Sequence, residues 1–566
     1  MIVSFNRVTA TAALLATSVL AGACGDDDPV QPVRPPTPPN VVVSATSATA
    51  VRVTFDAVSA ATSYLVQRAP GAAGTYATVG TPNSNSFDDT GLEPNTAYRY
   101  RVASVRGGDT SAFSADRDVT TLQAGRAQAI LDGTNPIAAN RTLYADTVYV
   151  LRGFVKVAPN VTLTIQPGTK IVGDTNTVGS SLYVLRGARL EANGTREHPI
   201  VFTSQREAPN RKPGDWGGIV IIGRGVINRT ANPILTEGPA GVSENYAGGS
   251  DNNDSSGSLR FVRIEFAGYD ISSGNGQELN SLSMYAVGRG TTLEYVQALA
   301  GLDDSFEWWG GAVDGRYLVS YESGDDHFDW TEGYRGRNQF LIAYQSTRLT
   351  PRTGAGTLSG DPRAFEGDGC DPGVAGCTVA ATGTSEPFSL PVFANFTVIG
   401  PGTLAGFPVD GNALVARRGT GGVFVNGAIA RWPGRAINVR DAFTDSLRLR
   451  DSLYIGYLAL AENGANYDPD GSSFGQEAKF AANGMTATAG AATTLFASVS
   501  GPNLDFTPVA AGSAATGGLT TFPARISARV TNFFGATSLL ATSYRGAASP
   551  QGSNKWWEGW TAHVTN

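Results

Sequence analysis

Residues 303–311 read DDSFEWWGG, and residues 325–333 read DDHFDWTEG. The two stretches match position by position at a separation of 22 residues, so that Phe306 corresponds to Phe328 and Trp308 to Trp330. A fixed period of this length is typical of a stacked-coil fold, in which each coil adds strands to growing sheets. We therefore expect equivalent residues of the two copies to lie one strand spacing apart, about 4.8 Å.

Short β-branched segments separated by Gly, Asn, Asp and Pro surround this pair of motifs. The pentapeptide YVLRG occurs at 149–153 and again at 183–187. Such patterns predict an all-β protein, and for residues 129–566 they indicate a right-handed parallel β-helix. A solenoid needs covered ends, and we expect the tryptophan-rich C-terminal tail to form a cap, with Trp556, Trp557 and Trp560.

Several motifs of this region resemble bacterial envelope β-helix proteins of the broad pectin-lyase-like class. They are PGT at 167–169, PIVFTS at 199–204 and GDWGG at 214–218. The resemblance implies the β-helix fold. It also implies a polysaccharide as partner, because pectate lyases and polygalacturonases on this scaffold bind acidic polysaccharide along the coil face, with Ca²⁺ or paired Asp residues.

Residues 40–122 form a separate pattern of alternating strands and turns. The run GLEPNTAY at 91–98 resembles the tyrosine corner of fibronectin type III domains, in which the hydroxyl of Tyr98 bonds back across the turn. Phe55 stands where that family usually has Trp. The resemblance implies an N-terminal β-sandwich, and such modules are most often spacers.

The N-terminus predicts export. Residues 1–23 have the charged start and short apolar core of a signal peptide. The sequence LAGAC at 20–24 resembles a bacterial lipobox, which implies a lipid on Cys24 and a membrane anchor; an ordinary signal peptide is the alternative. Residues 24–39, rich in Asp and Pro, read as a tether. Gly25 favours sorting to the outer membrane, so we expect a cell-envelope or cell-surface protein.

The two remaining cysteines, Cys370 and Cys377, flank a turn-rich hexapeptide. An exported protein meets an oxidising compartment, so we expect a disulfide between them. The net charge of −7 argues against a nucleic-acid binder, which would carry a basic stripe.

Side-chain alternation sorts the doubled motif by face. If Phe306 and Trp308 point inward, the outward positions of the two copies form an acidic patch: Asp303, Ser305 and Glu307 with Asp325, His327 and Asp329. We expect a corner at Asp304 and Asp326. Stacked carboxylates repel, and the repulsion can be offset by a hard cation, by a raised pKa or by a nearby Arg. The metal hypothesis is a Ca²⁺ site at Asp303, Glu307, Asp325 and Asp329. The alternative is that Asp and Gly only make corners, with carboxylates bonded to backbone amides.

Candidate catalytic residues are Asp303, Asp325 and His327, but no complete catalytic set accompanies them. The other two histidines lie far away in sequence, no Lys lies near the two copies, and the sequence lacks a phosphate loop and HExxH. The favoured hypothesis is therefore a surface-anchored lipoprotein whose β-helix binds polysaccharide or another extracellular ligand. The alternatives are a polysaccharide lyase or glycoside hydrolase acting at this motif, and a structural or adhesive protein.

Overall fold

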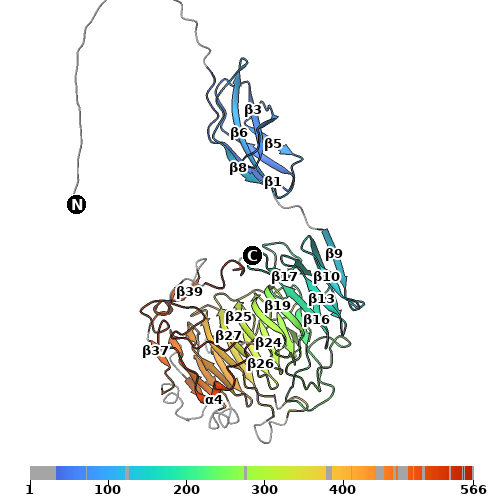
Figure 1. The fold of residues 1–566 in the computed structure, drawn as a ribbon, viewed down its shortest axis with the longest axis vertical. Coiled ribbons are helices and arrows are strands. Elements are labelled where there is room, and N and C mark those ends of the chain that lie inside the picture. Colours follow the sequence, from blue (N-terminus) through green and yellow to red (C-terminus); the bar gives the residue numbers. More distant parts are fainter. Residues whose placement is uncertain are drawn as a thin grey trace, which may run out of the picture. The chain divides into compact units, whose positions relative to one another are not determined.

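We describe the protein from a computed structural model (Figure 1), which divides into two compact units, 1–125 and 126–566. The structure describes residues 34–563 except 72, 122–126, 273–276, 372, 378–384, 409–410, 441–451, 463–466, 470–481, 489, 500–503, 535–536, 551 and 553–554. The described residues form many strands and almost no helix, as the sequence predicts. Cys24 and the expected signal peptide lie outside the described residues.

The first unit is a β-sandwich with one three-stranded and one five-stranded sheet. The smaller sheet contains β1 (Val42–Ser47), β2 (Ala50–Thr54) and β5 (Ser86–Thr90), and the larger contains β3 (Ser63–Pro70), β4 (Ala77–Gly80), β6 (Ala97–Arg106), β7 (Asp109–Thr110) and β8 (Arg117–Thr120). Tyr98 on β6 accepts a hydrogen bond at its hydroxyl from the N–H of Glu93, 3.0 Å away. The tyrosine corner is therefore present, and Phe55 is buried in the core beside Tyr64.

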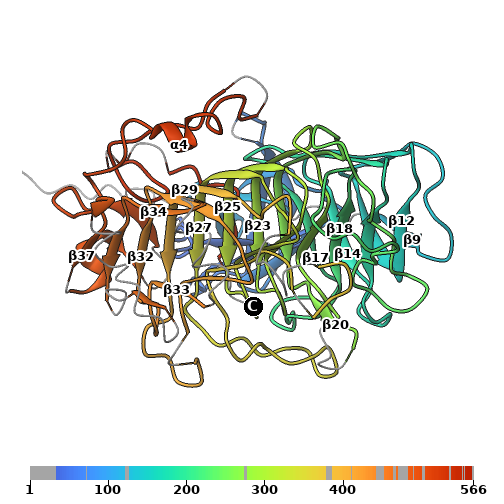
Figure 2. The ribbon, with the colours of Figure 1, turned by 90° about the horizontal axis from the view of Figure 1, so that it is seen from below.

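The second unit consists of stacked coils that contribute to two long parallel sheets (Figure 2). The ten-stranded sheet contains β12 (Phe154–Val157), β15 (Ser181–Val184), β18 (Gly218–Ile222), β22 (Leu282–Tyr285), β24 (Phe306–Trp309), β26 (Phe328–Thr331), β28 (Phe365–Asp368), β30 (Leu414–Arg417), β33 (Ile437–Val439) and β36 (Tyr467–Pro469). This arrangement confirms the predicted parallel β-helix.

The seventeen-stranded sheet forms the other side of the coils. Its strands are β9 (Ala127–Asp132), β10 (Arg141–Leu143), β11 (Thr147–Arg152), β13 (Thr162–Ile165), β14 (Lys170–Gly173), β16 (Arg189–Asn193), β17 (Ile200–Ser204), β19 (Gly257–Glu265), β23 (Thr292–Leu299), β25 (Asp314–Tyr321), β27 (Arg337–Tyr344), β29 (Val392–Ile399), β31 (Gly422–Val425), β32 (Ala428–Ala430), β34 (Leu453–Gly456), β35 (Ala459–Ala461) and β37 (Thr486–Thr488). Short elements outside both sheets are β20 (Tyr269–Asp270), β21 (Glu278–Leu279), the 3-10 helix η1 (Ala492–Thr494), β38 (Phe496–Ser498), β39 (Asp505–Pro508) and α4 (Ala524–Ser527). In the described residues, no helix is long and apolar enough to cross a bilayer.

The core between the sheets is built from stacked rows of identical or similar side chains. Phe306, Phe328 and Phe365 follow one another on β24, β26 and β28, with ring centroids 5.5 and 5.3 Å apart. Trp308 pairs with Trp330 in the same register, and both are fully buried. The 22-residue period of the sequence is therefore the length of one coil.

A second aromatic row marks a bend in four neighbouring strands of the seventeen-stranded sheet, β19, β23, β25 and β27. Phe261, Tyr295, Tyr317 and Phe340 all have positive φ, and successive rings stack 4.4, 4.4 and 5.2 Å apart. The expected cap lies here instead: Trp560 packs edge-on against Phe261 and Tyr295 in the middle of the sheet. The tail thus covers the side of the β-helix, because the aromatic row offers it an apolar surface.

Candidate functional site

The site centres on three carboxylates, Glu307, Asp329 and Glu366, which we call the carboxylate row. They occupy equivalent positions on β24, β26 and β28, where parallel pairing sets Glu307 beside Asp329 and Asp329 beside Glu366. Neighbouring strands are about 4.8 Å apart. The aromatic residues that flank the row members on these strands are buried in the core, so the row lies on the outer face of the ten-stranded sheet, as expected for Glu307 and Asp329.

Two further carboxylates form the corner that precedes each strand. The Oδ1 atom of Asp304 accepts the N–H of Asp326 at 2.8 Å, and the Oδ1 atom of Asp326 accepts the N–H of Arg363 at 2.6 Å. Asn280 does the same for the N–H of Asp304, at 3.0 Å. One oxygen of Asp304 and one of Asp326 therefore serve the backbone ladder, as the corner alternative proposed. The other oxygen of Asp326 lies 3.8 Å from a guanidinium nitrogen of Arg363, and the other oxygen of Asp304 remains for the site.

His327 does not face the acidic patch, so its predicted position is wrong. The side chain is 1% exposed, with Nδ1 2.6 Å from the Oγ of Ser320 and its ring against Trp432. Ser305, its equivalent in the preceding coil, is also fully buried. The corner interrupts the alternation of the strand and turns both side chains inward. Burial lowers the pKa of His327 to about 3, so the imidazole is neutral.

The remaining predicted residues, Asp303 and Asp325, lie at the outer side of the corner and are partly buried. Ligand atoms lie within 4.8 Å of one another in three overlapping groups: Asp303, Asp304 and Asp325; Asp304, Glu307 and Asp329; and Asp326, Asp329 and Glu366. The structure thus brings together the four predicted metal ligands, with Asp304, Asp326 and Glu366 between or beside them.

Sequence reasoning missed Glu366. Its signal was the pair Phe365-Glu366, which repeats the Phe–acid pairs at 306–307 and 328–329. A search at a period of 22 residues does not find this third pair, because the coil from Phe328 to Phe365 is 37 residues long. A longer coil places its extra residues in a turn and leaves the strand register unchanged.

Arginines neutralise only one end of the carboxylate row. Arg363, which is 2% exposed, contacts Glu366 and Asp361. Arg417 contacts Glu366 and lies 2.8 Å from Asp368. Within the described part of the chain, Glu307 and Asp329 form no ion pair with Lys or Arg. The row therefore runs from an unpaired acidic end to an end balanced by guanidinium groups.

The carboxyl groups at the acidic end have raised pKa values. Burial is the largest cause, followed by neighbouring carboxylates, and together they raise the pKa values of Asp303, Asp304 and Glu307 well above the usual range. The pKa of Asp329 is raised to about 7 by burial and by Asp368. Such a cluster holds protons near neutral pH or, when ionised, a cation.

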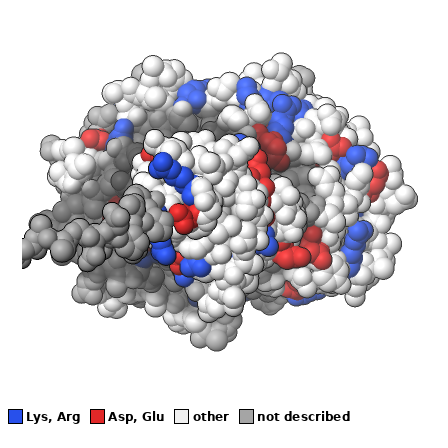
Figure 3. Space-filling model, turned by 90° about the horizontal axis from the view of Figure 1, so that it is seen from above, with Lys and Arg blue, Asp and Glu red and all other residues white. Residues whose placement is uncertain are grey.

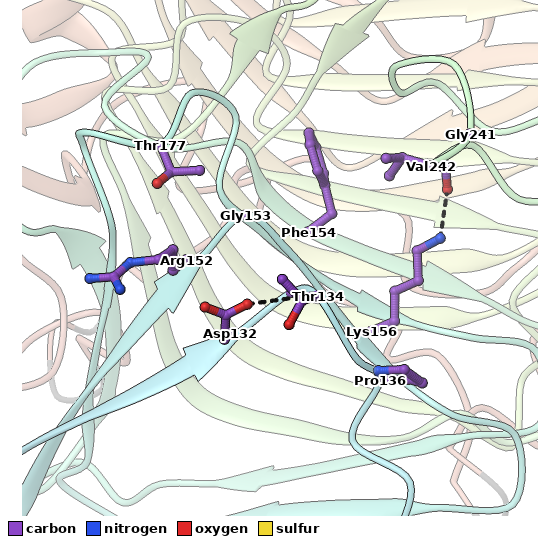
Figure 4. Close-up of a pocket in the computed structure, with 11 residues that line it drawn as sticks. Asp132, Thr134, Pro136, Arg152, Gly153, Phe154, Lys156, Thr177, Gly241 and Val242 are labelled. Atoms are coloured by element: carbon purple, nitrogen blue, oxygen red, sulfur yellow. Dashed lines mark hydrogen bonds between the residues drawn. The ribbon is translucent and has the colours of Figure 1, made fainter.

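A separate hollow of about 570 Å³ lies at the N-terminal end of the β-helix (Figure 4). Its basic side chains are already engaged: Lys156 bonds to the carbonyl of Val242 at 3.1 Å and to Glu244 at 2.7 Å, and Arg152 pairs with Asp174 at 2.9 Å. On the surface shown in Figure 3, basic and acidic side chains are likewise interspersed. The unpaired charges of the carboxylate row distinguish it from these places.

The predicted disulfide joins Cys370 and Cys377, whose Cα atoms are 5.7 Å apart. It closes a short loop after β28, and the backbone N–H of Cys370 bonds to the carbonyl of Arg418. The disulfide therefore lies next to the arginine-balanced end of the carboxylate row.

Fold and site together define a two-unit, all-β protein whose larger unit is a parallel β-helix with an acidic outer row. The chain belongs to the family with a pectate-lyase-like beta helix domain, whose family model matches residues 135–500. Residues 34–120 match the fibronectin type III domain. A comparison with curated proteins finds no significant match.

Several solved structures are similar over 16% of this chain, which is about the length of the first unit. An Fn3-like protein from Clostridium thermocellum is 28% identical over 16% of this chain and 98% of its own, with a TM-score of 0.15. The FN5 domain of Drosophila Lar is 22% identical over 16% of this chain and 99% of its own, with a TM-score of 0.15. A titin fragment is 23% identical over 16% of this chain and 33% of its own, also with a TM-score of 0.15. The chain spans a third or less of the first structures that it matches.

Proposed function

We propose that the β-helix binds a polysaccharide at the carboxylate row. The observation that carries this proposal is the pair of buried oxygens, Oδ1 of Asp325 and Oδ1 of Asp329, that have no hydrogen-bond partner among the described residues. Buried acceptors without a donor are costly, and a ligand that brings hydroxyl donors satisfies them. Sugars are dense in hydroxyl groups, and membership of the pectate-lyase-like family supports a polysaccharide-related function.

A hard cation is the second component of the proposal. Carboxylate oxygens are the ligands that Ca²⁺ prefers, and Asp303, Glu307, Asp325 and Asp329 lie in the three overlapping ligand groups. A bound Ca²⁺ would offset the repulsion within the acidic end and would allow an acidic sugar to approach it.

Cleavage of the polysaccharide is the alternative function. It is favoured by the pKa of Asp329, raised to about 7, because a glycosidase needs one protonated and one ionised carboxyl group. Asp303 and Asp325 are the other candidates for such a pair. His327 is too deeply buried to reach a substrate, so a catalytic role for it is not proposed again.

Isothermal titration against a panel of neutral and acidic polysaccharides, with CaCl₂ or EDTA, tests the binding proposal. We expect binding to the wild type and a loss of about tenfold or more in Asp325→Asn and Asp329→Asn, since each removes a charged acceptor. Glu207→Gln is the matched control, because Glu207 is an exposed carboxylate in the same unit.

Three results separate the alternatives. Release of reducing ends or of unsaturated products from the same panel indicates a hydrolase or a lyase. Binding that is insensitive to EDTA removes the cation from the proposal. A wild type that binds no member of the panel overturns the proposal and favours a structural or adhesive role.

We also propose that the protein is exported and held on the outer membrane by a lipid on Cys24. The support is the sequence LAGAC at 20–24 and the Pro-rich segment after it. Metabolic labelling with an alkyne fatty acid should mark the wild type and leave Cys24→Ser unlabelled and soluble. Equal labelling of both would contradict the anchor.

A further inference from the structure

A second cluster of like charges lies at the opposite ends of the strands that carry the acidic residues. A cavity of about 500 Å³ is lined by Val226, Asn252, Arg289, Arg335, Pro387 and Arg529. We call it the arginine pocket. Three of its six residues are arginines and none is acidic. The pocket is therefore strongly cationic, in contrast to the net charge of −7 of the whole chain.

Three distant segments supply the guanidinium groups. Arg289 lies in the turn between β22 and β23, Arg335 in the turn between β26 and β27, and Arg529 just after α4. The first two turns follow the C-terminal ends of strands in the ten-stranded sheet, whereas Asp303 and Asp325 precede the N-terminal ends of β24 and β26. The arginine pocket is thus separate from the carboxylate row.

The arginines lack acidic partners. In the described part of the chain, the side chains of Arg289 and Arg335 form no ion pair or hydrogen bond. Arg529 bonds only to backbone carbonyls, those of Leu390 and of Arg335, the latter at 2.9 Å. Asp314, the carboxylate whose charge acts on Arg529, is already bound by Arg337. The positive charge of the pocket is therefore not balanced by these residues.

The charges also act on one another. The pKa of Arg529 is lowered to about 10, first by burial and then by the neighbouring Arg335, Arg337 and Arg289. A repulsion of this kind destabilises the pocket unless an anion offsets it. Asn252 adds a neutral donor: its Oδ1 accepts the N–H of Val226 at 2.9 Å, which leaves its amide NH₂ for a ligand.

We propose that the arginine pocket binds an oxyanion, namely the carboxylate, sulfate or phosphate group of a ligand. Guanidinium groups present planar pairs of N–H donors that match two oxygens of such a group. The cavity is larger than a single ion and has the size of an ordinary small-molecule site, so it also accommodates part of the molecule that carries the group.

Titration of the full chain with galacturonate, inorganic sulfate and inorganic phosphate at constant ionic strength tests the proposal. We expect at least one of the three to bind, to raise the melting temperature, and to bind about tenfold more weakly to Arg289→Gln and to Arg335→Gln. The anion that binds best identifies the class of ligand. Arg141→Gln is the matched control. Arg141 is exposed on β10, and its substitution removes the same charge from outside the pocket.

Two outcomes overturn the proposal: none of the anions binds at millimolar concentration, or Arg141→Gln weakens binding as much as the pocket variants do. The second outcome would indicate a general charge effect. Asp329→Asn should bind the anions as the wild type does. A failure of the carboxylate row to bind polysaccharide is therefore distinguishable from a failure of the arginine pocket.

Discussion

Glu307 on β24 lies beside Asp329 on β26 in parallel register, and neither carboxylate forms an ion pair within the described residues. Two unit charges about 5 Å apart at an effective dielectric constant of 20 repel by about 3 kcal/mol. The outer face of the ten-stranded sheet therefore contains a destabilising contact that a proton, a cation or a ligand can relieve.

Asp329→Asn should stabilise the protein at alkaline pH. The folded pKa of Asp329 is about 7 and the unfolded value is about 3.9. The stability that the protonated carboxyl group of Asp329 contributes to the fold is therefore fully present below about pH 4 and is lost as the pH rises through about 7. In urea unfolding at pH 8, we expect the free energy of unfolding of the variant to exceed that of the wild type by on the order of 2 to 4 kcal/mol. At pH 4.5 the difference should be much smaller.

Glu207→Gln serves again as the control and should not differ from the wild type at either pH. A constant difference between Asp329→Asn and the wild type across this range would show that Asp329 is ionised at all these pH values in the folded protein.

His327→Ala should destabilise the protein without affecting the site. The imidazole is buried against Trp432, so its removal leaves a cavity that costs about 2 to 4 kcal/mol. Its pKa is lowered to about 3 by burial, so the wild type loses the stability that depends on neutral His327 as the pH falls from about 6.5 towards 3, and the variant lacks this loss.

The measurement is urea unfolding at pH 7 and pH 5, combined with polysaccharide titration of the folded variant. If the variant stays folded but no longer binds polysaccharide, His327 contacts the ligand, and this result would contradict its buried position.

Tyr98→Phe should destabilise the fibronectin type III unit by about 1 kcal/mol, because the partly buried N–H of Glu93 loses its acceptor. Calorimetry of the full chain should show the change in the transition of the first unit. Tyr144→Phe is the control, since Tyr144 is 52% exposed and belongs to the second unit. An unchanged transition in Tyr98→Phe would mean that the hydroxyl contributes nothing to the corner.

Trp560→Ala should release the C-terminal tail from the aromatic row. The ring is 1% exposed, lies 5.7 and 6.0 Å from Phe261 and Tyr295, and its N–H bonds to the carbonyl of Trp556. Loss of this ring should cost about 3 to 5 kcal/mol. We expect faster proteolysis after residue 540.

Leu540→Ala in the same tail should change stability by less than about 0.5 kcal/mol, because its side chain is 56% exposed. Equal resistance of Trp560→Ala and the wild type to proteolysis would show that other contacts hold the tail.

The period of the sequence predicted the stacking of Phe306 on Phe328 and the outward position of Glu307 and Asp329, because strand register follows from repeat length. It did not predict the inward turn of His327, since alternation holds within a strand and fails at a corner. Glu366 escaped notice because insertions lengthen a coil without shifting its strand. Arg529 and Trp560 belong to a tail without repeats, so the periodicity of the sequence could not predict their contacts.

That tail connects coils that are far apart in the chain. Gln297 bonds to Ala562 across 265 residues, and Arg196 bonds to the carbonyl of Glu558 across 362 residues. A simple solenoid can unravel one coil at a time, because each coil contacts only its neighbours. Here a segment late in the chain secures coils that are synthesised long before it, so the nascent β-helix reaches its full mechanical strength only once that segment has been made and has docked.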